Sequence, residues 1–151
     1  MLHEEQLRSA SAIKEIPGAN DIINSLRNHP DWKPAIATGG WHDWAVYKLK
    51  CTDLLFPEIP IATSDDAPTR RMIVQHSIER ACRQYGVSKF EKMVAIGDNI
   101  WDVKTAKLLN LPFIGVGNRD LLLQEGTGTV IDNYLDQQQF MDGLNNAGVP
   151  R

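Results

Sequence analysis

The chain has little cysteine, no long apolar run and no concentration of basic residues. Its two cysteines, Cys51 and Cys82, are far apart, which argues against a disulfide framework or a CxxC metal site and fits a reduced, cytoplasmic setting. No apolar run approaches the ~20 residues of a membrane span, and the polar, acidic start does not resemble a secretory signal. The formal charge of −3 argues against nucleic acid as a partner, because phosphate backbones require clustered Lys and Arg.

Short apolar runs alternate with amphipathic helical patterns along the 151 residues, which are enough for one hydrophobic core. This alternation predicts an α/β fold with a doubly wound parallel sheet. Pro60 places its strand at a sheet edge, since proline cannot donate to a ladder. The clearest helix, over 69–85, is predicted to bury Val74, Ile78, Ala81, Cys82 and Tyr85 and to stop at Gly86. The predicted strands are 34–37, 59–62, 93–96, 113–116 and 129–131.

Polar residues directly after the strands are the first candidates for a functional site, because open α/β sheets bind ligands at the carboxyl ends of their strands. The strongest local pattern is AIGDNIWDVKTA, residues 95–106. Asp98 follows a strand and Asp102 comes four residues later, a spacing that can bring two carboxylates to one Mg²⁺ site. The alternative is that either aspartate caps the following helix, a common use of this residue.

A second pattern is IATGG, residues 36–40, where a hydroxyl at a strand end precedes two glycines. Thr38 could donate its hydroxyl to a phosphate, while Gly39 and Gly40 let backbone N–H groups approach closely. The alternative is an ordinary glycine-rich turn. Arg70 or Arg71, at the start of the longest helix, could neutralise charge on a transferring phosphoryl group, although surface arginines are far more common.

Taken in order, these three patterns resemble the second, third and fourth motifs of the haloacid dehalogenase (HAD) superfamily. The residues in and around them are similar to those of its phosphoglycolate-phosphatase-like branch. The resemblance runs from about Pro17 to Leu144. It implies a Mg²⁺-dependent phosphohydrolase acting on a small phosphorylated substrate. Thr38, Gly39 and Gly40 would hold the phosphoryl group, Arg70 (or Arg71) would balance charge, and Asp98 and Asp102 would form the metal site. Residues 1–16 would be a remnant of the cap domain or a linker helix, and 17–151 the core.

The family's first motif, DxDxT or DxDxV, does not occur in the sequence. The nucleophilic aspartate, the central strand that carries it and most of the cap domain are therefore expected upstream of Met1, and the chain alone is expected to be inactive or nearly so. A second hypothesis is a pseudo-enzyme that binds phosphate and Mg²⁺ without turnover. A third, a receiver-like or dinucleotide-binding domain, lacks the third glycine of the dinucleotide fingerprint at Gly115–Gly117.

A missing central strand would leave two strands with unpaired edges. The polar residues 1–16 are a poor replacement for it, and exchange between identical chains is a low-cost route to a dimer. The sequence therefore predicts a homodimer.

Overall fold

A computed structural model describes residues 15–151, so the predicted remnant segment 1–16 lies almost entirely outside the described residues. The chain forms two compact units, the first ending at Gly86 and the second beginning at Val87. In both units the strands pair in parallel and helices connect them, which confirms the predicted α/β class. No helix within residues 15–151 is long and apolar enough to cross a membrane.

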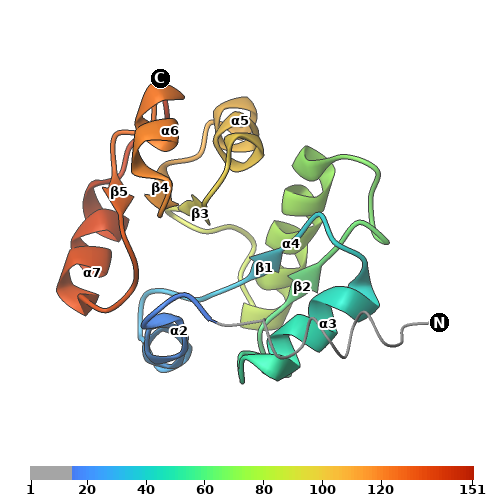
Figure 1. Ribbon diagram of the computed structural model, residues 1–151. Helices are drawn as coiled ribbons and strands as arrows, with labels where there is room; N and C mark the ends of the chain where they lie inside the picture. Colours follow the sequence, from blue (N-terminus) through green and yellow to red (C-terminus); the bar gives the residue numbers. More distant parts are fainter. Residues whose placement is uncertain (1–14) are drawn as a thin grey trace, which may run out of the picture. The chain divides into compact units, whose positions relative to one another are not determined.

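Within residues 15–86 the first unit holds a two-stranded sheet and three helices (Figure 1). Ile36 pairs with Ile61 and Ala37 with Ala62, and Pro60 contributes only its carbonyl, which accepts the Ile36 N–H at 2.8 Å. Among the described residues β2 pairs with β1 alone, in agreement with the edge position predicted from Pro60. The elements are α2 (Ala19–Arg27), β1 (Ile36–Ala37), α3 (His42–Cys51), β2 (Ile61–Ala62) and α4 (Arg70–Tyr85).

Helix α4 has the predicted ends but a different buried face. Thr69 caps its start by accepting the Met72 N–H at 3.2 Å, and Gly86 ends it in the left-handed conformation. The fully buried side chains are Ile73, Ser77 and Ala81. Of the predicted set, only Ala81 is fully buried, while Val74, Ile78, Cys82 and Tyr85 are partly exposed. The face that packs on the strands includes a small polar residue, Ser77, which a search for apolar spacing cannot find.

The second unit is built around β4, whose four residues are all buried between two parallel neighbours. Gly115 of β4 is required there, because a Cβ at this position would lie 2.7 Å from Leu122. Phe113, Ile114 and Phe140 are among the most deeply buried side chains and form its core. The elements are β3 (Ala95–Gly97), α5 (Ile100–Leu109), β4 (Phe113–Val116), α6 (Arg119–Gln124), β5 (Val130–Ile131) and α7 (Gln137–Asn146).

The strands of residues 15–151 form two sheets, β1-β2 and β3-β4-β5, and no ladder joins β1 to β3. These are the two strands that end in Thr38 and Asp98. Each has one strand neighbour, and each carries an uncovered residue, Ala37 on β1 and Ile96 on β3. A parallel strand inside a doubly wound sheet is normally covered on both faces.

Candidate active site

Three hydrogen bonds fix the turn after β1 to the end of β2, and a fourth lies within the turn. Thr38 donates its N–H to the Ala62 carbonyl at 3.0 Å, and the Gly40 N–H donates back to the Thr38 hydroxyl oxygen at 3.2 Å. The Gly40 carbonyl accepts from both the N–H and the hydroxyl of Ser64, at 3.2 and 3.0 Å. Ser64 therefore holds the turn in one conformation. The sequence shows that Ser64 follows a strand but does not indicate this contact.

The pinned turn leaves two donors unused by the described part of the chain. The hydrogen bonds of residues 15–151 include none from the Gly39 N–H and none in which the Thr38 hydroxyl donates its proton. Gly39 is also exposed. A fixed turn with an exposed backbone N–H beside a hydroxyl donor can bind an anionic oxygen without reorganisation.

Arg70 lies against this turn. A Cβ added to Gly39 would be 3.1 Å from one terminal nitrogen of the Arg70 guanidinium and 3.2 Å from its central carbon. The cation therefore lies close to the Gly39 backbone, and a side chain at residue 39 would require the guanidinium to shift. The first unit thus brings Arg70 next to the turn of Thr38, Gly39 and Gly40, while the choice between Arg70 and Arg71 as the charge-balancing residue stays a prediction.

The turn after β3 depends on Asp102. Its Oδ2 accepts the backbone N–H groups of Asp98 and Asn99 at 3.1 and 3.3 Å, while Asn99 caps α5 by accepting from Trp101 and Asp102. This reciprocal arrangement is a capping box at the start of α5. The alternative use as a helix cap thus applies to Asp102, whereas Asn99, not Asp98, is the N-cap residue.

Gly97 makes the position of Asp102 possible. A Cβ at residue 97 would lie 2.4 Å from the Asp102 side chain, a separation that real Cβ atoms do not show. Gly97 and Asp102 therefore depend on each other: the aspartate can hold the turn only because residue 97 has no side chain. Because one carboxylate oxygen of Asp102 already accepts two backbone donors, its geometry suits holding the turn of Asp98 rather than replacing Asp98 as a ligand.

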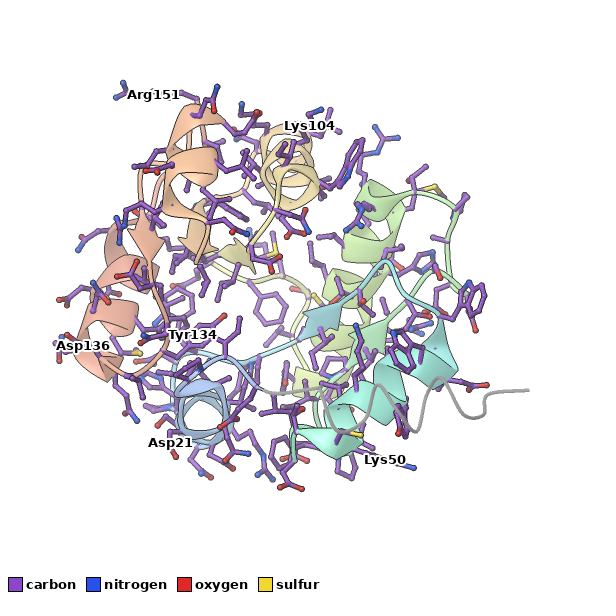
Figure 2. All side chains as sticks on the ribbon, in the orientation of Figure 1. Asp21, Lys50, Lys104, Tyr134, Asp136 and Arg151 are labelled. Carbon is purple, nitrogen blue, oxygen red and sulfur yellow. The ribbon has the colours of Figure 1, made fainter. Side chains whose placement is uncertain are left out.

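Asp98 itself is exposed and its backbone is fixed from two sides. Asp102 accepts its N–H, and the Asn118 side chain donates to its carbonyl at 2.9 Å. Asn118 follows β4 with φ 35°, a left-handed conformation that asparagine tolerates better than most residues. Tyr134, labelled in Figure 2, is sensitive to this charge: burial and then the negative charge of Asp98 raise the pKa of Tyr134 to about 12. Neither Asn118 nor Tyr134 was singled out from the sequence, although Asn118 occupies a strand-end position.

The carboxylates fit a Mg²⁺ site of the kind that keeps most of its water. Residues 15–151 contain no group of three or more His, Cys, Asp or Glu side chains that could enclose a metal ion. Mg²⁺, however, is commonly held by one or two carboxylates together with waters and substrate oxygens. Asp98, exposed and with its backbone held by its neighbours, could serve as such a carboxylate.

Comparison with known proteins shows which family the chain belongs to. The sequence pattern of haloacid dehalogenase-like hydrolases matches residues 3–110. A hydrolase from Pseudomonas syringae has 26% identity and a TM-score of 0.73 over 90% of this chain, and a protein assigned as beta-phosphoglucomutase from Thermotoga maritima has 25% and 0.66 over 86%. A haloacid dehalogenase-like protein of unknown function from Agrobacterium tumefaciens, at 18% identity, 93% coverage and a TM-score of 0.66, supports the fold.

The chain spans 66%, 62% and 66% of the lengths of these three structures, respectively. No curated protein sequence matches it. The match over residues 3–110 includes both strand-end turns described above and favours the hydrolase interpretation over the receiver-like or dinucleotide-binding alternative. The chain belongs to the haloacid dehalogenase-like hydrolase family.

Proposed function

We propose that this chain carries the phosphate-holding and Mg²⁺-holding parts of a phosphohydrolase of the phosphoglycolate-phosphatase-like branch, which acts on a small phosphate monoester. The observation that carries the proposal is the turn at Thr38, Gly39 and Gly40, in which two donors have no acceptor among residues 15–151 while the Arg70 cation lies against Gly39. The proposed setting is the cytoplasm, which agrees with Cys51 and Cys82 being free thiols. The net charge of −3 gives no reason to propose a nucleic-acid partner.

Each residue has a defined role in the proposed site. The Thr38 hydroxyl and the Gly39 N–H donate to phosphoryl oxygens, and Arg70 balances the negative charge of phosphate and nucleophile. Asp98 would hold Mg²⁺, and Asp102 and Asn118 would keep Asp98 in place through its backbone. When bound, Mg²⁺ would neutralise phosphoryl oxygens and orient them.

The second candidate function is binding without turnover. It is favoured by the lack of a DxDxT or DxDxV pattern in the 151 residues, because the family reaction begins with attack by the first aspartate of that motif. Both candidates share the phosphate and Mg²⁺ roles and differ only in whether a nucleophile is supplied from elsewhere.

Binding of inorganic phosphate, measured by titration calorimetry, tests the shared part. Thr38→Val is expected to weaken binding roughly 30-fold, corresponding to about 2 kcal/mol for a hydrogen bond to a charged group, and Thr38→Ser should retain most of the affinity. If phosphate binds equally well to the wild type and to Thr38→Val, the turn is not the phosphate site.

Coupling between the two ligands tests whether the proposed phosphate role of the first unit and the proposed Mg²⁺ role of the second belong to one function. Mg²⁺ is expected to tighten phosphate binding about tenfold, within the usual range of coupling between ligands, and Asp98→Asn should remove this effect without changing phosphate affinity in the absence of metal. Asp120→Asn, which removes another exposed carboxylate of the second unit, is the matched control and should leave the coupling intact. Phosphate affinity that does not respond to Mg²⁺ would contradict the proposed link between the two roles.

We also propose that the chain forms a homodimer. Among residues 15–151, β1 and β3 each have a strand neighbour on one side only, and unpaired edges tend to pair with another strand. Light scattering at micromolar concentration should give twice the 16.9 kDa mass of the chain. A single species of 16.9 kDa across the concentration range would contradict the dimer.

A further inference from the structure

Trp41 is an exposed aromatic residue that neither the fold nor the proposed phosphate site explains. Its side chain is 73% exposed, the highest value among the exposed large apolar residues of the described chain. A tryptophan removes 150–250 Å² of surface from water when it is buried. An exposed tryptophan therefore does not contribute this large hydrophobic stabilisation to folding. Single exposed apolar residues are common, but their position decides whether they have a use.

Trp41 directly follows the proposed phosphate-holding turn. It is the N-cap residue of α3 in an extended conformation (φ −66°, ψ 151°), so its side chain lies outside the regular helix. Only two residues separate it from Thr38, and three residue steps span at most about 11 Å even when fully extended. The chain is not fully extended here, because the Gly40 N–H bonds back to the Thr38 hydroxyl oxygen. Trp41 therefore lies less than this distance along the chain from the Thr38 hydroxyl, close enough for its ring to meet an ester group that points toward α3.

A second aromatic ring supports the same side of the turn. The Cδ1 atom of Trp44 would be 3.7 Å from a Cβ on Gly40, so the ring packs against the turn itself. Trp44 is fixed in turn by stacking on Tyr47, with ring centroids 5.6 Å apart, and by Lys48, whose amino group lies 5.7 Å from the Trp44 ring centroid. The turn thus has a cation at Gly39 and aromatic rings at and after Gly40.

We propose that Trp41 determines substrate specificity by stacking on a flat aromatic ring in the ester group, so that the substrate class is an aromatic phosphate monoester. This inference rests on the proposed function, since it requires phosphate to bind at Thr38 and Gly39. The cationic side of the turn suits the phosphoryl group, and the aromatic side suits a ring one or two bonds away from it. Stacking of a flat ring on an exposed aromatic side chain commonly changes affinity by about tenfold or more.

Three ligands separate the contributions of the phosphate and the ring: inorganic phosphate, cyclohexyl phosphate and phenyl phosphate. Titration calorimetry of the 151-residue chain should show phenyl phosphate binding about tenfold more tightly than cyclohexyl phosphate, which has a ring of similar size without a flat aromatic face. Trp41→Ala should abolish this difference and leave inorganic phosphate unchanged, and Trp41→Phe should retain most of it. Trp101→Ala, which removes an exposed tryptophan (56%) of the second unit, is the matched control and should retain the difference.

Each result has a defined meaning. Equal affinity of the wild type for the two esters, or an unchanged preference in Trp41→Ala, would overturn the assignment of Trp41 while leaving the phosphate site in place. Absence of Thr38-dependent binding of inorganic phosphate would overturn the proposed function and this inference together. If Trp41→Ala changes the mass by light scattering but not the ligand preference, Trp41 is a contact between protein chains, and the substrate class proposed here is wrong.

Discussion

The 151-residue chain is expected to hydrolyse p-nitrophenyl phosphate in the presence of Mg²⁺ at a rate on the order of 10⁶ below that of a complete enzyme. The proposed mechanism needs an aspartate nucleophile, and no DxDxT or DxDxV pattern occurs in the sequence. In this proposal Thr38, Arg70 and Asp98 would hold a phosphate and a metal ion, and none of them has the role of attacking phosphorus. A continuous absorbance assay for p-nitrophenol at high protein concentration measures this directly.

Asp98→Asn is the control for that assay, because activity from a contaminating phosphatase would not change in the variant. Turnover in the ordinary range of ~1–10³ s⁻¹ that disappears in Asp98→Asn would contradict the prediction. It would mean that another residue of this chain acts as nucleophile, and the binding-only alternative would also be excluded.

The strands and the polar residues that follow them could be predicted because both depend on patterns that are local in the sequence. Each of the five predicted strands overlaps an observed one, and the polar residues after β1 and β3 lie at the turns where the sequence placed them. β1 is shorter than predicted and begins at Ile36, after Pro34, which cannot donate to a ladder. The parallel pairing followed from the helix between each pair of strands.

Close approaches between a side chain and the backbone could not be predicted, because the spacing of residues along the sequence does not indicate which of them meet in the fold. The contact of the Arg70 guanidinium with Gly39 joins residues 31 positions apart, and the contact of Asp102 with Gly97 depends on the angle at which α5 leaves β3. The same limit explains the error in α4, where Ser77 rather than Val74 or Ile78 is fully buried. A small residue fits where helix and strands approach closely, and apolar periodicity favours the larger ones.

The first unit also contains an ion pair that the sequence did not indicate and that we expect to be important for stability. Arg80 of α4 makes two hydrogen bonds to the Asp66 carboxylate, at 2.6 and 2.9 Å, and a third to the Ile61 carbonyl at 2.5 Å. Asp66 also accepts the Thr63 N–H at 2.8 Å. The side chains of Arg80 and Asp66 are only 35% and 22% exposed. This pair connects α4 to β2 and to the residues that follow it.

Arg80→Ala is expected to lower the free energy of unfolding at pH 7 by about 2 kcal/mol, in the range for lost hydrogen bonds to a charged group and reduced from the buried case by solvent screening. Urea unfolding followed by tryptophan fluorescence measures the change. Arg83→Ala, which removes an exposed arginine one turn later in the same helix, should change stability by less than ~0.5 kcal/mol. Equal effects of the two substitutions would show that the ion pair contributes nothing specific.

The pH dependence distinguishes loss of the ion pair from loss of packing. Hydrogen bonds from Arg80 and then from the Thr63 N–H lower the pKa of Asp66 from 3.8 to about 2. Since the folded-state pKa is depressed, the stabilisation is fully present above pH 4 and is lost as the pH falls from about 4 to about 2. The wild type should therefore lose stability over this interval, and its advantage over Arg80→Ala should shrink with it. An advantage that stays constant from pH 7 to pH 2 would mean that Arg80 stabilises the helix through its aliphatic stem, and the ion pair would then have no measurable role.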